Sequence, residues 1–198
     1  MIRSLSTLPL ALVMTACVSV LPPPDVPEGL YRFGAMPAEH SVQSTVLVRE
    51  PDASRLFGGR AIASEDSTGA LRLVRGVEWT DSATRMMQLA LLDSLGGEGA
   101  RAAVSAESGA QADYELSWRL SDFTLAGTNG RCSLEATLVD ARTRAVVAQA
   151  NVSTSASASG SDNPSRAGAL IEAGRACVRE VGDFVAEKAV PDTDLSGS

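Results

Sequence analysis

Few side chains in this sequence could do covalent or acid–base chemistry near neutral pH. There are three cysteines, Cys17, Cys132 and Cys177, and one histidine, His40. A thiol can carry an acyl group, form a disulfide or bind a metal, and an imidazole can act as a general base. No CxxC or HxxxH spacing joins these residues, so we predict no metal site and no cofactor. His40 lies in a loop-like stretch, MPAEHSVQ, without a Gly-x-Ser-x-Gly motif, so we interpret it as a solvated residue and predict no catalytic residues.

Cys17 follows the parts of an export signal. Arg3 supplies a positive charge, residues 8–14 are mostly apolar, and small residues precede the cysteine. The apolar run is shorter than the roughly 20 residues that a membrane-spanning helix needs. The letters MTAC resemble the lipobox of bacterial lipoproteins, with Met in place of the usual Leu. We therefore predict a lipoprotein signal peptide at 1–16 and lipidation of Cys17, by a diacylglycerol on the thiol and a fatty acyl chain such as palmitate on the amine. The alternatives are a plain secretory signal or a cytosolic start.

The rest of the chain divides into three parts. Residues 17–29 are predicted to be a lipidated, Pro-rich tether, residues 30–189 one domain, and residues 190–198 a disordered tail. Residue 18 is Val rather than Asp, which favours the periplasmic side of the outer membrane over retention at the inner membrane. The net charge of −7 argues against nucleic acid as a partner, and the 44% hydrophobic content can build a core.

Strands are indicated by alternation and by β-branched residues. Tyr114, Leu116, Trp118 and Leu120 alternate with polar residues, as in a sheet with one covered and one wet face, on which Glu115 and Arg119 would lie. The predicted strands are 31–33, 44–50, a hairpin of RAIASED and ALRLVRG around DSTG, a weaker strand at RAAVSAE, 114–125, and two strands around a turn at 140–144.

Two helices are predicted from apolar positions at helical spacing. The first runs from about 81 to 95, with Thr80 or Asp81 as N-cap, and the second from about 165 to 188, with Asn163 or Ser165 as N-cap. Two amphipathic helices packed on one face of a mixed or antiparallel sheet give a single two-layer α+β domain.

Cys132 and Cys177 form a candidate disulfide pair. Cys132 opens a predicted strand, and Cys177 lies on the apolar face of the last predicted helix. A helix packed on the sheet could bring them within bonding distance, and an oxidising compartment would favour the bond. The alternative is two separate buried free thiols.

The order of these segments resembles a known family. LYRFG is followed by STVLVREPDASRLFGGRAIASED and LRLVRGVEWTDSATRMMQLALLDSL, and then by ADYELSWRLSDFTL and LEATLVDARTRAVV. This series is similar to the ABC-type transport auxiliary lipoproteins, the PqiC-like family, across nearly the whole chain after Cys17. One departure is EWTD, where the family usually has Trp-Ala-Asp/Glu-Pro.

The resemblance implies a non-catalytic lipoprotein that works with a mammalian-cell-entry (MCE) type ABC transporter moving lipid between the inner and outer membranes. The implied partners are an MCE-domain periplasmic protein with its ABC transporter complex, the membrane through the lipid anchor, and further copies of the chain in a homo-oligomer. One alternative is an assembly or plug lipoprotein of another outer-membrane machine, such as lipopolysaccharide insertion. A second is a lipid-anchored hydrolase that uses His40.

Overall fold

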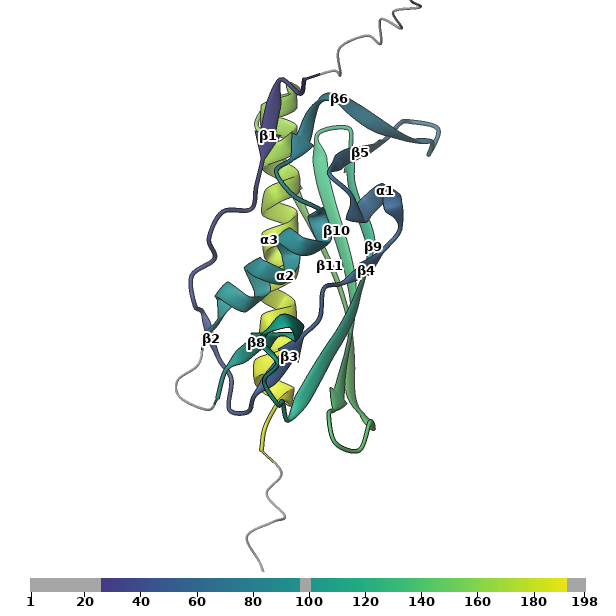
Figure 1. Cartoon of the computed structure of the whole chain (residues 1–198). Coiled ribbons are helices and arrows are strands. Elements are labelled where there is room, and N and C mark those ends of the chain that lie inside the picture. Colours follow the sequence, from purple (N-terminus) through teal and green to yellow (C-terminus); the bar gives the residue numbers. More distant parts are fainter. Residues whose placement is uncertain (1–25, 97–100, 192–198) are drawn as a thin grey trace, which may run out of the picture.

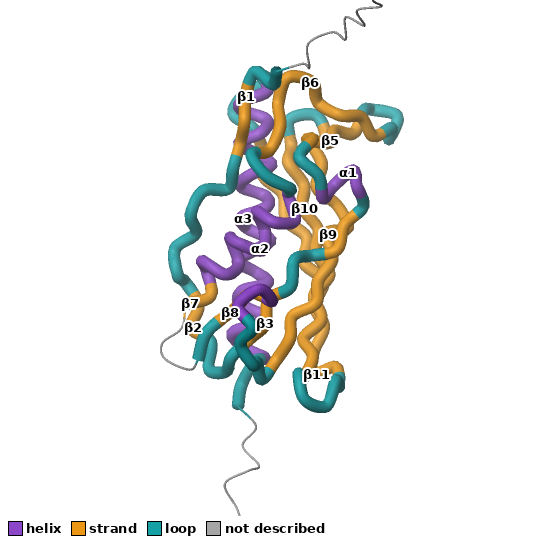
Figure 2. Tube along the Cα trace, in the orientation of Figure 1, coloured by secondary structure: helices purple, strands orange, loops and turns teal. Residues whose placement is uncertain are grey.

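The computed structural model describes residues 26–96 and 101–191 (Figure 1). These residues form a single α+β domain with a large, curled mixed sheet, as the sequence predicts. The two long helices, α2 (Ala83–Ser94) and α3 (Asn163–Lys188), lie together on one side of the sheet (Figure 2). Within the described ranges, no helix is both long and apolar enough to cross a membrane.

The sheet is built around the strand with the clearest alternation, β9 (Tyr114–Ala126). It pairs antiparallel along its length with β10 (Asn129–Asp140), which pairs antiparallel with β11 (Val146–Ser157). The four alternating apolar residues of β9 predicted to face the core are all buried. The two strands predicted around a turn at 140–144 are also confirmed, although β10 begins three residues before Cys132.

The other edge of β9 is covered by three short strands in succession. These are β3 (Val46–Val48), β4 (Asp52–Ala53) and β5 (Ala61–Glu65), and each runs parallel to β9. β5 then turns back into β6 (Leu71–Trp79), which confirms the predicted hairpin. The remaining elements are β1 (Gly29–Tyr31) beside β6, β8 (Ala103–Ser105) beside β3, the pair β2 (His40–Ser41) and β7 (Leu95–Gly96), α1 (Arg55–Gly58) and the 3-10 turn η1 (Ala106–Ser108).

Three details of the sequence prediction need correction. The first strand lies two residues earlier than the predicted 31–33, because it pairs with the end of β6. The N-caps are Ser82 for α2 and Asp162 for α3, whose side chains accept hydrogen bonds from the backbone N–H groups of Arg85 and Ser165. Both helices were placed correctly from their apolar stripes, but the cap lies one to three residues away from the predicted candidates.

Three aromatic rings join distant parts of the chain at the centre of the core. The rings of Trp79 and Phe123 are stacked with centroids 5.4 Å apart, and Phe33 meets each of them edge-on at 6.0 Å. Trp79 is fully buried at the junction of β6 and α2, so it is a core residue. Rings of this size contribute a large share of the buried apolar area of a small domain.

The segment between β1 and β2 lies along α3. Its close approach to the helix requires glycine at two helix positions. A Cβ atom on Gly174 would lie 2.6 Å from Cζ of Phe33, and one on Gly182 would lie 2.6 Å from Cδ2 of His40. These glycines are eight residues apart, about 12 Å along the helix axis. Side chains larger than hydrogen at these points would therefore push the N-terminal segment off the helix.

We predict that Gly174→Ala destabilises the protein although alanine is the better helix former. The clash with Phe33 and Phe123 should lower the free energy of unfolding by about 1–3 kcal/mol. Gly168→Ala in the same helix is the matched control, because a Cβ there meets no atom within 4 Å. It should raise the free energy of unfolding by up to about 1 kcal/mol. Urea unfolding measures both changes, and equal stabilisation by the two variants would contradict this packing.

Candidate functional site

Cys17 lies outside the described residues, so its lipidation stays a prediction. The first described residue, Val26, is nine positions further along the chain. Gly29, the last residue assigned to the tether, is already the first residue of β1. The domain therefore begins directly after the Pro-rich stretch.

Cys132 and Cys177 come together in the core. Cys132 faces inward from β10, Cys177 lies on the buried stripe of α3, and both are free thiols with no exposed surface. Burial raises the pKa of the Cys132 thiol, which also makes a hydrogen bond with Cys177. The hydroxyl of Thr154 lies 3.3 Å from Sγ of Cys177. The structure thus brings the predicted pair side by side, and the disulfide itself stays a prediction.

His40 is packed against α3 rather than solvated in a loop. Its Nδ1 lies 3.2 Å from Oδ1 of Asp183, and the side chain is only 11% exposed. Its Nε2 is buried and has no hydrogen-bond partner among the described residues. A Ser-His-Asp mechanism needs a hydroxyl at that nitrogen. The expectation of a solvated histidine is therefore wrong, and no hydroxyl of residues 26–96 or 101–191 bonds to Nε2 as the hydrolase alternative requires.

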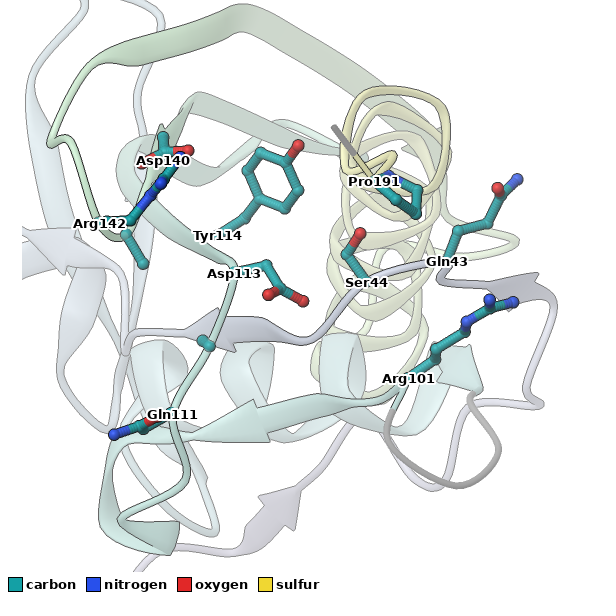
Figure 3. Close-up of a pocket in the computed structure, with 11 residues that line it drawn as sticks. Gln43, Ser44, Arg101, Gln111, Asp113, Tyr114, Asp140, Arg142 and Pro191 are labelled. Carbon is teal, nitrogen blue, oxygen red and sulfur yellow. The ribbon is translucent and has the colours of Figure 1, made fainter. Parts of the chain in front are cut away.

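A concave pocket of about 780 Å³ opens where β9 begins and the chain leaves α3 (Figure 3). Its walls come from five segments: the residues before β3, the residues before β8, the residues around the start of β9, the turn after β10 and the end of α3. The lining residues are Gln43, Ser44, Arg101, Gln111, Ala112, Asp113, Tyr114, Asp140, Ala141, Arg142 and Pro191.

The polar groups of this pocket hold its walls together. Asp113 accepts a hydrogen bond of 2.8 Å from the backbone N–H of Thr45, and the Tyr114 hydroxyl donates to the carbonyl of Val190. Asp140 accepts from both the N–H and the hydroxyl of Thr143, which lowers the pKa of its carboxyl. The lining contains neither His nor Cys, and no group in the described part of the chain gathers three potential metal ligands. The pocket is therefore suited to polar binding rather than to acid–base chemistry near neutral pH.

Glu115 is a buried charge on the face of β9 that points away from the helices. Its side chain is 8% exposed, with Oε1 2.5 Å from Nε of Arg49 and Oε2 2.7 Å from Nη1 of Arg144. Hydrogen bonds from these two guanidinium groups lower the pKa of Glu115 to about 2. The alternation predicted the correct face but not the burial, because the two arginines that cover Glu115 come from distant parts of the chain. Arg119 on the same face is exposed and pairs with Glu135.

β11 leaves one long edge of the sheet open. Among the described residues it pairs only with β10. Its sequence, VVAQANVSTSAS, contains no charged residue and no proline. Natural edge strands usually carry lysine, proline or a bulge that prevents pairing with another chain. Here the only irregularity is a register shift near Val139, so most of this edge can accept a further strand.

Comparison with known proteins identifies the family. The family model described as "ABC-type transport auxiliary lipoprotein component" matches residues 33–186. The chain belongs to this family. The match runs from Phe33 almost to the end of α3, so it includes the core, the pocket wall of β9 and β10, and the open edge. The resemblance inferred from the sequence segments is confirmed.

Two solved structures share the fold of this auxiliary lipoprotein. A protein from Xanthomonas campestris, of family DUF330, has a TM-score of 0.70 at 20% identity, covering 83% of this chain and 96% of that one. An uncharacterized protein has a TM-score of 0.62 at 10% identity, covering 82% and 99%. At these identities the likeness shows the fold alone. No curated protein matches the chain.

We predict that Glu115→Gln lowers the free energy of unfolding by about 1–2 kcal/mol at pH 7, since two charge-assisted hydrogen bonds lose their anion. The folded-state pKa lies below the ordinary value of 4.5, so the stabilisation is present above pH 4.5 and is lost as the pH falls toward 2. The difference between the wild type and the variant should therefore shrink over that range. Glu135→Gln, in an exposed pair, should cost less than about 1 kcal/mol. A pH-independent difference would contradict this role of the carboxylate.

We further predict that Cys132 and Cys177 are bonded in protein taken from an oxidising compartment. The two residues are 45 positions apart, and closing a loop of that length stabilises a fold by about 4 kcal/mol on the chain-entropy model. The measurement is alkylation in denaturant followed by mass spectrometry, with and without reductant. Two alkylated thiols before reduction would show that the pair stays free.

Proposed function

We propose that this protein is a lipoprotein anchored to the periplasmic side of the outer membrane. It acts there as a non-catalytic auxiliary component of an MCE-type ABC transport system that moves lipid between the inner and outer membranes. The observation that carries the proposal is the family match over residues 33–186. The MCE partner and the outer membrane come from the resemblance and from the residues around Cys17.

The start of the described chain is compatible with an anchor. Val26 is 84% exposed, so the preceding chain can leave the domain without crossing it. Eight residues lie between Cys17 and Val26, and they include three consecutive prolines. Pro-rich segments favour extended conformations that hold a domain clear of its attachment point.

The open edge of β11 is the surface we assign to the MCE-domain partner. An extended segment can add to such an edge through main-chain hydrogen bonds, with side-chain contacts supplying specificity. The edge is uncharged over its whole length, so it repels neither an acidic nor a basic segment. We also expect the protein to form homo-oligomers, as the resemblance implies.

The test is affinity capture of the full-length protein from detergent-solubilised membranes of its own organism. The expected result is a triacylated Cys17 peptide together with an MCE-domain protein, both identified by mass spectrometry. Cys17→Ser should lose the acyl chains and leave the membrane fraction. An unmodified Cys17 would overturn the anchor. A lipidated Cys17 without an MCE partner would overturn the transport role and favour the assembly-factor alternative.

The same capture can test the partner surface. Replacing exposed Gln149 and Ser153 of β11 with lysine should reduce the captured MCE-domain protein on the order of tenfold, equal to about 1.4 kcal/mol. Ala106→Lys with Ala110→Lys, at exposed positions away from the strand and outside the pocket lining, is the matched control and should leave capture unchanged. Light scattering on the same variants measures self-association. Loss of the oligomer with unchanged partner capture would assign the edge to a second copy instead.

A further inference from the structure

Four exposed large hydrophobic side chains lie on β6, on β1 and just before β1, which pairs with residues 77–79 at the far end of β6. Leu71 and Leu73 of β6 are 44% and 56% exposed and are two residues apart on one strand. Val26 and Leu30 belong to β1 and the residues before it, and β1 pairs with β6. These four make up half of the large hydrophobic residues exposed within the described ranges; the others are Leu89, Val146, Val147 and Val190.

The hairpin that carries Leu71 and Leu73 is held by its own turn. Oδ1 of Asp66 accepts hydrogen bonds from the N–H of Thr68 at 2.9 Å and of Ala70 at 3.1 Å, and Oδ2 lies 3.0 Å from Arg72. Figure 1 shows the β5–β6 hairpin projecting from the body of the domain. The two leucines are therefore presented on a fixed projection rather than packed into the core.

The hairpin base and the start of the chain meet. A Cβ on Gly76 would lie 3.2 Å from Cδ of Glu28, and Asn163 at the start of α3 donates to the carbonyl of Arg75. The nine residue-to-residue steps from Cys17 to Val26 span at most about 30 Å. An acyl chain on Cys17 would thus keep this end of the domain, and its hairpin, close to the bilayer.

The charge of the hairpin suits a phospholipid surface. From Asp66 to Arg75 the segment has two arginines and one aspartate, in a chain whose net charge is −7. Arg72 is paired with Asp66, whereas the exposed Arg75 forms no ion pair with any described residue. Leucines beside arginine are typical of segments that lie in a membrane interface, with the apolar side chains at the acyl boundary and the cation among the headgroups.

We propose that the tip of the β5–β6 hairpin inserts Leu71 and Leu73 into the phospholipid surface to which Cys17 is anchored. The inference rests on the proposed function only for the acylation of Cys17. The anchor alone would let the domain rotate about its tether, whereas a second contact at the hairpin sets its orientation. The domain would then hold its β11 edge and its pocket at fixed angles to the membrane.

The experiment places a tryptophan at the tip of the full-length, acylated protein in vesicles of phosphatidylethanolamine and phosphatidylglycerol. In Leu73→Trp the new indole should be quenched by doxyl-labelled phospholipid, lowering its emission roughly two-fold, since interfacial side chains reach the acyl boundary. Trp79 and Trp118 are 0% and 3% exposed and are shielded from the label. Val147→Trp, at a 45% exposed position at the opposite end of the sheet, is the matched control and should not be quenched.

The outcomes separate this inference from the proposed function. A protein with acylated Cys17 and an unquenched Leu73→Trp indole would overturn the hairpin contact and leave the anchor intact. A blue-shifted but unquenched indole would mean that protein covers the tip, which also overturns the lipid contact. If circular dichroism shows that Leu73→Trp does not fold, quenching is measured on Leu71→Trp instead, with the same expected result. An unmodified Cys17, identified from the N-terminal peptide mass, would overturn both proposals. Failure to capture an MCE partner would overturn the proposed transport function and leave the hairpin contact unaffected.

Discussion

The hydrogen bonding of β9 is the constraint on which the rest of the fold depends. A buried strand must pair its backbone groups on both edges, because an unpaired N–H or C=O away from water is costly. β10 satisfies one edge along its length. The other edge is satisfied in three steps by β3, β4 and β5, all parallel to β9, so the chain advances along that edge in one direction. The short helix α1 takes up the chain between β4 and β5, and β5 then continues along the same edge.

The long elements of the fold could be predicted from local sequence patterns, whereas the short ones could not. β9 was evident from its alternation, and α2 and α3 from their apolar stripes, because each has one covered face along its whole length. β4 has two residues and α1 has four, too few to show a period, and both exist because β9 needs partners at that point. The helix caps were missed for a related reason. Several residues before each helix can cap it, and the entry of the chain from the sheet selects one.

The candidate site also has one feature that the sequence predicts locally and others that depend on contacts between distant residues. The cysteine motif at Cys17 is a local signal and could be read from a few letters, whereas the burial of Glu115 depends on arginines 66 and 29 residues away. The pocket is assembled from five separate segments, so no single stretch of the sequence could predict it. Gly174 and Gly182 have no local signal in the sequence, and only the structure shows that they are contact points for the N-terminal segment.

The length of α3 has a mechanical consequence. Its 26 residues form a rod of about 39 Å. The start of the rod is tied to β6 near the first described residues, and its far end lies against the polar pocket, where Tyr114 holds the carbonyl of Val190. The helix therefore fixes the distance between the two ends of the domain. A ligand bound at the pocket would therefore lie about one helix length from the start of α3, and a change in the length of the predicted tether would shift the whole domain without changing the binding surface.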